Sequence, residues 1–123
     1  MNKSIKGLLI DPENRTVTEV DIQAGEDGSH LESMCKNLNC MWVDTSRNRL
    51  DWLPGGCPDD VWFDDEGMFG EPKHFFQIPG WQAIAGRGLI FGHDSKGHSV
   101  NHTLNERQVE ALRSGILFIQ KGV

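Results

Sequence analysis

The tract 60–94 constrains the fold more than any other part of this sequence. It opens with a short apolar run, Val61 to Phe63, which ends in an acidic turn at 64–67. After a connection rich in glycine and proline, it continues into a longer apolar run, Gln82 to Phe91. Strands joined by such a connection tend to lie side by side. We therefore predict two neighbouring strands of one sheet, with Gln82–Phe91 at the centre of the fold.

The N-terminal residues predict an antiparallel hairpin. The apolar run Ile5–Ile10 stops at Asp11-Pro12, and Thr16–Ile22 alternates between apolar and polar residues. The connection 11–15 contains proline and asparagine, which favour turns. Because Val20 and Ile22 share a face that Val17 does not, the second strand should have two distinct sides.

Two amphipathic helices are predicted. In the first, apolar residues recur at helical spacing: Leu31, Met34, Cys35 and Leu38. Its N-cap is expected at Asp27 or Ser29. In the second, Thr103 and Glu106 have the spacing of a capping box, and the inner face holds Leu104, Val109 and Leu112.

Three shorter segments complete the expected order. They are a strand at Cys40–Val43, an extended piece at His74–Ile78 and a final buried strand at Ile116–Ile119. The pattern predicts a single α+β domain over residues 1–123. We expect a mainly antiparallel sheet of five to six strands with two helices packed on one face.

Charge and composition exclude several functional classes. The net charge is −6, and the twelve Lys and Arg residues form no cluster, which disfavours general nucleic-acid binding. No apolar run has the length of a membrane span, and no signal peptide is recognised. The three cysteines lack a zinc-type spacing, and the thiols are expected to be free in the cytoplasm. No cofactor is predicted.

Acidic residues and histidines form two candidate metal sites. Asp59, Asp60, Asp64, Asp65 and Glu66 offer oxygen ligands for Mg²⁺ or Ca²⁺, but their spacing is not that of a calcium loop, so a solvated turn is the favoured interpretation. A second group could bind a transition metal or supply a general base, with His74 as a further ligand. Its members are His93, Asp94, His98 and His102. An exposed turn is again favoured.

A glycine-rich stretch and two thiols are weaker candidates. Gly86, Gly88 and Gly92 miss the spacing of a dinucleotide-binding turn and lie within a predicted strand. Arg87, between two of these glycines, is a candidate contact for an anion or ligand. Cys57 is the thiol expected to be most exposed, whereas Cys35 should be a small buried side chain.

Aromatic residues near loops indicate a binding surface. Two thin layers do not easily bury every large ring, and tryptophan is enriched at protein interfaces. The rings in question are Trp52, Trp62, Phe69 and Trp81.

Several motifs together resemble a family of small uncharacterised proteins of phages and mobile elements. They are IKGLLIDPENRTVTEVDI, VWFDDEG, AIAGRGLIFGHDSKG and LNERQVEAL followed by ILFI. The resemblance covers most of the chain, and it implies an accessory protein that acts on host machinery in the host cytoplasm.

Two functional hypotheses follow. The favoured one is a phage-type protein that inhibits or redirects a host protein, or counters host defence. It would bind through Trp52, Asp64, Asp65, Glu66, Trp81 and Arg87, and self-association through a sheet edge is also considered. The alternative is a small-molecule or nucleotide-binding protein, including a metal-dependent hydrolase, centred on Arg87, His93, Asp94 and His98.

Overall fold

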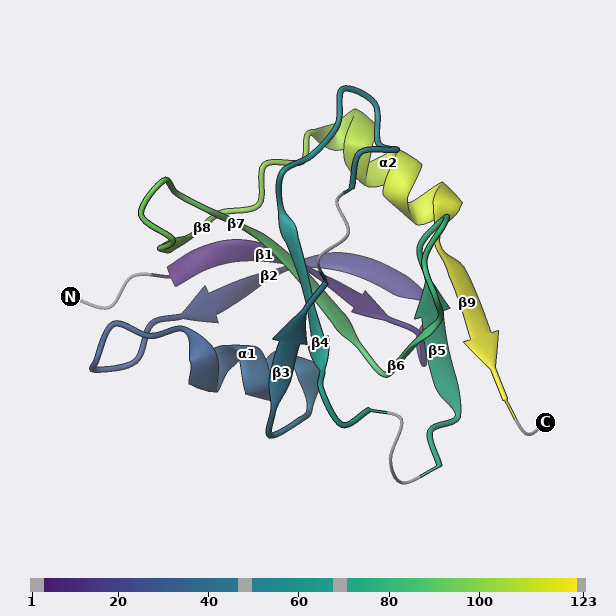
Figure 1. Cartoon of the computed structure of the whole chain (residues 1–123), viewed down its shortest axis with the longest axis horizontal. Coiled ribbons are helices and arrows are strands. Elements are labelled where there is room, and N and C mark those ends of the chain that lie inside the picture. Colours follow the sequence, from purple (N-terminus) through teal and green to yellow (C-terminus); the bar gives the residue numbers. More distant parts are fainter. Residues whose placement is uncertain (1–3, 47–49, 68–70, 122–123) are drawn as a thin grey trace.

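The computed structural model describes residues 4–46, 50–67 and 71–121. These residues form two helices, α1 (Leu31–Leu38) and α2 (Glu106–Gly115), and two antiparallel sheets (Figure 1). The main sheet contains β1 (Ser4–Asp11), β2 (Thr16–Gln23), β3 (Val43–Thr45), β4 (Asp60–Asp64), β7 (Gly88–His93) and β8 (Ser99–Val100). The small sheet contains β5 (His74–Gln77), β6 (Ile84–Ala85) and β9 (Leu117–Gln120). The predicted α+β class with a mainly antiparallel sheet is confirmed.

The N-terminal hairpin has the predicted form. β1 and β2 pair from Ser4 opposite Gln23 to Asp11 opposite Thr16. The Asp11 carboxylate accepts hydrogen bonds from the backbone amides of Glu13 and Asn14, at 3.1 and 3.3 Å, and so closes the turn. This is the local bonding that makes aspartate favourable at turns.

The predicted neighbours β4 and β7 do pair, but the run Gln82–Phe91 is not one strand. Gly86 has a φ of 82°, a conformation that only glycine adopts without strain, and it separates β6 from β7. β6 joins β5 in the small sheet, whereas β7 lies between β1 and β4 in the main sheet. At Gly88, a Cβ atom would lie 2.5 Å from the ring of Phe76, so the missing side chain lets the small sheet approach β7.

The two helices cover opposite faces of the main sheet, which corrects the expectation that they share one. Leu8 and Ile10 of β1 pack in the same core as Leu112 of α2. Ile5 of the same strand packs instead with Met34 of α1. Because side chains alternate across a strand, the two sets lie on opposite sides. Helical periodicity predicts which stripe is apolar but not which sheet face that stripe will meet.

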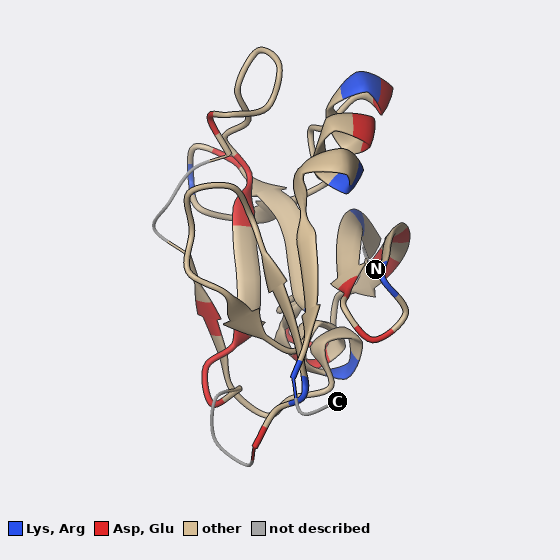
Figure 2. Cartoon of the chain, turned by 90° about the vertical axis from the view of Figure 1, so that its right-hand side faces the viewer, with Lys and Arg blue, Asp and Glu red and all other residues tan. Residues whose placement is uncertain are grey.

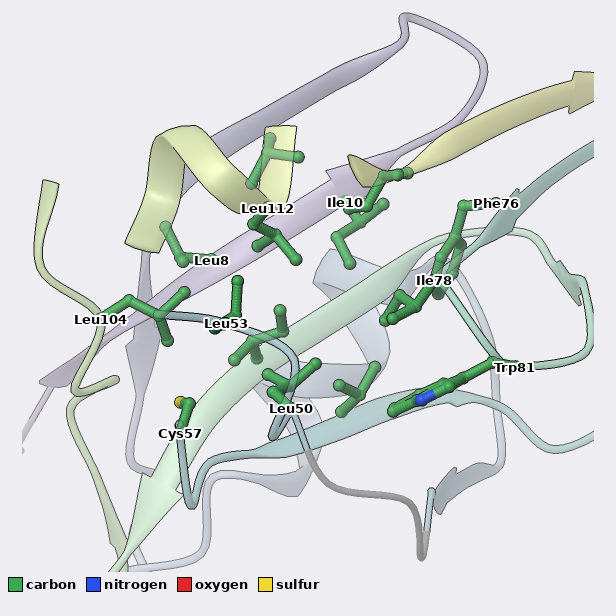
Figure 3. Close-up of a cluster of buried hydrophobic side chains, with 14 residues drawn as sticks. Leu8, Ile10, Leu50, Leu53, Cys57, Phe76, Ile78, Trp81, Leu104 and Leu112 are labelled. Carbon is green, nitrogen blue, oxygen red and sulfur yellow. The ribbon is translucent and has the colours of Figure 1, made fainter. Parts of the chain in front are cut away.

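The larger core lies between β1, β7, α2, the small sheet and the segment 50–57 (Figure 3). The buried Gln108 side chain fastens that segment to α2, because its amide nitrogen donates to the carbonyl oxygens of Pro54 and Gly56, both at 2.9 Å. The core side chains labelled in Figure 3 are Leu8, Ile10, Leu50, Leu53, Cys57, Phe76, Ile78, Trp81, Leu104 and Leu112.

The helix caps differ from those predicted. Asn105, not Thr103, caps α2: its side chain accepts from the Gln108 amide at 2.9 Å, and the Gln108 side chain accepts from the Asn105 amide at 3.0 Å. The N-cap of α1 is His30 rather than Asp27 or Ser29. Both shifts have the same cause, since several polar residues precede each helix and only backbone geometry selects among them.

Three shorter expectations need adjustment. The strand predicted at Cys40–Val43 begins later, as β3 (Val43–Thr45), whereas the extended piece at His74–Ile78 is confirmed as β5. The last strand, β9, is an edge of the small sheet, and it therefore exposes Leu117 instead of being fully buried. Leu31, predicted on the inner face of α1, is exposed, while Met34 and Leu38 are buried.

Candidate functional site

Of the two tryptophans predicted to contact a partner, Trp81 is buried and Trp52 is partly buried. Trp81 is only 8% exposed and is part of the larger core, which it enters from the turn after Ile78 (Figure 3). Trp52 is half-buried against the same core, with its ring over Gly115. Trp62 stacks on Phe91, with ring centroids 5.8 Å apart. Phe69 lies outside the described residues. Sequence reasoning missed that Trp81 and Trp52 pack into the core formed by α2 and the segment 50–57.

The predicted acidic cluster is divided by β4. Asp59 and Asp60 lie at the start of this strand, and Asp64, Asp65 and Glu66 lie at its end. Three residues of extended chain lie between Asp60 and Asp64, so the two are about 13 Å apart. The five carboxylates therefore do not form one ligand set. In Figure 2 the acidic residues are distributed over several strand ends and loops, and the basic residues are scattered.

At the start of β4, both carboxylates have protein partners. Asp59 is 3% exposed and accepts hydrogen bonds from the backbone amide and the hydroxyl of Thr103, at 2.7 and 3.0 Å. Asp60 pairs with Nδ1 of His93 at 2.7 Å. These contacts tie β4 to the segment before α2 and to the end of β7, so this end of the strand is structural.

The histidines predicted to form a metal site are divided among separate pairs. His93 contacts Asp60, whereas His102 contacts Glu19, with Nε2 3.0 Å from the carboxylate. Asp94 accepts from the backbone amides of His98 and Lys96, and these bonds, with the first the larger cause, hold the pKa of its carboxyl below the ordinary value. In the parts of the chain that are described, no three His, Cys, Asp or Glu side chains gather closely enough to hold a metal ion.

Arg87 lies at the opposite end of β7 from these histidines. The six residues of β7 lie between Arg87 and Asp94, which corresponds to a distance of about 23 Å along an extended strand. Its guanidinium donates to the carbonyl oxygen of Asn37 at 3.1 Å and lies 4.0 Å from Asp11. Burial raises the pKa of the Asp11 carboxyl, but hydrogen bonds from Asn14 and the nearby Arg87 outweigh it, and the pKa lies below the ordinary value. Arg87 thus joins the end of α1 to the hairpin turn, and the geometry does not combine it with His93, Asp94 and His98.

A wider groove, of about 900 Å³, lies between the loop before α1 and the β7–β8 turn. Asp94 and His98 are among its lining residues, and His30 borders it from the other side. The Nδ1 atom of His98 lies 3.4 Å from Asp94, and the same carboxylate already accepts the two amides of its turn. The polar groups predicted for chemistry here are therefore engaged in holding the turn.

The structure places Cys57 in the interior and not at the surface. It was expected to be the most exposed thiol, but it is buried in the larger core, with its sulfur 3.8 Å from the hydroxyl of Thr103. Burial is the main cause that raises its thiol pKa. A buried, protonated thiol is a poor nucleophile, so Cys57 is a packing residue.

The most exposed pair of large apolar side chains in the described part of the chain was not predicted. Met41 is 82% exposed and Trp42 is 60% exposed, and they directly precede β3, the edge strand of the main sheet. The backbone at Trp42 is fixed by a hydrogen bond, which its carbonyl oxygen accepts from the Asp65 amide at 2.9 Å. The sequence did carry a signal: CMWV is an apolar run beside a polar turn, but it was assigned wholly to a strand.

Pairing between β3 and β4 places Trp42 beside carboxylates. Asp44 lies opposite Phe63 in the ladder, and Trp42 lies opposite Asp65 through the bond just described. Residues two apart on a strand share a face, so Trp42, Asp44 and Asp65 point to the same side of this sheet edge. We call the set Met41, Trp42, Asp44, Asp65 and Glu66 the Trp42 surface. Asp64 pairs with Val43 and points to the other face, towards α1.

A small groove adjoins the Trp42 surface. It has a volume of about 210 Å³ and lies between the turn that ends β4 and the segment around β6, with Phe63 and Ile84 on its apolar side and Asp64 and Asp65 at its rim. Small-molecule sites usually have roughly 300–1,000 Å³. The groove therefore suits a single protein side chain better than a substrate or nucleotide.

Comparisons with models of known protein families, with curated proteins and with solved structures give no match to this chain. The likeness to small phage proteins thus remains a prediction. In the described residues, neither α1 nor α2 has the length and apolar character needed to cross a membrane.

Proposed function

We propose that this chain is a small binding protein that holds a basic, partly apolar segment of another protein on the Trp42 surface. The observation that carries the proposal is an exposed methionine and tryptophan beside three carboxylates and a side-chain-sized groove. Aromatic residues supply most of the binding energy at protein interfaces, and surrounding charges select the partner.

The charges of the Trp42 surface favour a basic partner over a second copy of this chain. Two copies meeting through this surface would bring the same carboxylates face to face, which is unfavourable. The edge of β3 also has a local obstacle, because the Asp44 carboxylate accepts from the Thr45 amide at 2.8 Å. At the opposite edge of the sheet, in β2, the Arg113 guanidinium donates a hydrogen bond to the carbonyl oxygen of Val17 at 3.0 Å. Both edges thus oppose simple strand pairing between copies.

The proposal keeps the host-directed role and changes its residues. The partner would be a host protein that is inhibited or redirected in the cytoplasm of a phage-infected cell. The carboxylates Asp65 and Glu66 remain in the surface, while Met41, Trp42 and Asp44 take the place of Trp52, Asp64, Trp81 and Arg87. An apolar side chain of the partner would enter the groove beside Phe63, and its Lys or Arg residues would meet the carboxylates at the rim.

The test is capture of partners by the immobilised chain from a bacterial lysate, followed by titration of synthetic peptides from each captured protein. Trp42→Ala should weaken binding of the basic peptide about thirtyfold or more, since loss of a central aromatic typically costs about 2 kcal/mol or more. Leu117→Ala is the matched control, because Leu117 is comparably exposed but lies on β9. Equal binding by both variants would refute the proposal, as would peptides that bind without Lys or Arg.

A further inference from the structure

Two cysteines meet at the end of α1. Asn39 adopts a left-handed conformation, with φ 54° and ψ 49°, and ends the helix. Its amide bonds to the carbonyl oxygen of Lys36 at 3.3 Å, and the Cys40 amide bonds to that of Cys35 at 3.0 Å. This pair of bonds defines a Schellman motif, in which the side chains at the positions of Cys35 and Cys40 come into contact.

The two thiols interact directly. Burial, the Asp64 carboxylate and the hydrogen-bonded Cys35 thiol together raise the pKa of the Cys40 thiol to about 12. The Cys35 sulfur also lies 3.7 Å from the carbonyl oxygen of Met41. Both residues are half-buried, so a small reagent can reach them, whereas Cys57 is buried in the core on the other face of the sheet.

We propose that Cys35 and Cys40 form a dithiol site that closes to an intramolecular disulfide by exchange with a low-molecular-weight disulfide such as oxidised glutathione. The Cys35 thiolate attacks one sulfur of the reagent, which releases one small thiolate and leaves a mixed disulfide on Cys35. Cys40 then loses its proton and attacks the Cys35 sulfur, and the second small thiol leaves. The protein loses two electrons and two protons, and the reagent is reduced to two thiols.

The structure sets the order of these steps. The raised pKa of the Cys40 thiol disfavours it as the first nucleophile, so the proposal assigns the first attack to Cys35 and the second to Cys40. Contact across the helix end makes the second step intramolecular, which compensates for the small fraction of Cys40 thiolate. This site does not depend on the proposed binding function.

The test uses the folded chain, oxidised glutathione, alkylation of the remaining thiols, intact-mass measurement and peptide mapping. The wild type should lose the mass of two hydrogen atoms and yield a Cys35–Cys40 cross-linked peptide, with Cys57 still free. Cys40→Ser should stop at a glutathione adduct on Cys35, and Cys57→Ser should close as the wild type does.

Three results would overturn the assignment: a stable mixed disulfide in the wild type, failure of the folded wild type to react, or loss of closure in Cys57→Ser. Should a serine variant not fold, the cross-linked peptide from the wild type decides the question without it.

Discussion

The two ends of β4 carry the same kind of residue and have different roles. At the start of the strand, Asp59 is buried and accepts two hydrogen bonds from Thr103. At the end, Asp65 and Glu66 are exposed beside Trp42. A carboxylate is tolerated in the interior only where donors satisfy it, and it is free to meet a partner where they do not.

This difference shows why an acidic cluster in a sequence is a poor indicator of a site. Asp60 and Asp64 both flank a short apolar strand, yet that strand separates them and directs them to different neighbours. One end fastens β4 to the segment before α2, and the other contributes to the Trp42 surface. The donors that decide between these roles come from residues distant in sequence.

The largest effect is expected at the buried end. Asp59→Ala should lower the free energy of unfolding by about 2–3 kcal/mol, because it leaves the amide and hydroxyl of Thr103 without their acceptor. Urea denaturation measures the change. Asp51→Ala, an exposed carboxylate elsewhere, should stay within about 0.5 kcal/mol of wild type. Equal stability of the two variants would show that the bonds to Thr103 contribute little.

A smaller effect, on binding rather than stability, is expected at the exposed end. The double variant Asp65→Asn with Glu66→Gln removes two attractive charges. It should lower the affinity for the basic peptide roughly three- to tenfold at low salt. The difference from wild type should shrink towards 1 M salt, where screening is strong. Fluorescence anisotropy of a labelled peptide provides the measurement.

The matched control for that experiment removes the same charge elsewhere. Glu26→Gln with Asp51→Asn alters two exposed carboxylates outside the Trp42 surface. If this control weakened the peptide as much as the first double variant, binding would reflect net charge alone, and the comparison between the two ends of β4 would lose its functional meaning.

The smallest effect is a shift in thiol ionisation. Asp64→Asn should lower the pKa of the Cys40 thiol, because Asp64 is the second cause, after burial, of its rise to about 12. Asp60→Asn, at the other end of β4, should leave it unchanged. The pH dependence of Cys40 alkylation, followed by peptide mass measurement, distinguishes the two.

The same shift links pH to stability. In the unfolded chain the Cys40 thiol ionises near its ordinary value of 9.0, and in the folded chain near 12. The raised pKa therefore leaves the free energy of unfolding unchanged below about pH 9. It lowers that free energy as the pH rises from 9 towards 12, where the unfolded thiol ionises before the folded one. Cys40→Ser should remove this part of the alkaline destabilisation.

Local patterns predicted the elements of this fold better than their arrangement. Alternation in Thr16–Ile22 and helical spacing in 31–38 depend on near neighbours, and both elements are present. The division of Gln82–Phe91 depended on the conformation of Gly86 and on Phe76 packing against Gly88, contacts that no single run of residues reveals.

The candidate site was predicted only in part, for a related reason. The acidic turn 64–66 was recognised from composition, but Trp81 and Trp52 were expected at the surface because they lie near loops and two thin layers do not easily bury every large ring. Their burial depends on α2 and the segment 50–57. Trp42 is exposed because it precedes an edge strand, and the order of strands in the sheet cannot be deduced from local sequence.

The place of β7 between β1 and β4 has a consequence for biosynthesis. Leu8 pairs with Ile90, roughly 80 residues later in the chain, so the N-terminal hairpin has no partner on its inner edge until most of the protein has left the ribosome. Late insertion of a middle strand makes folding slow and exposes a pairing-competent edge on the nascent chain. The N-terminal hairpin is therefore protected from aggregation through its inner edge only after β7 has been synthesised and has paired with β1.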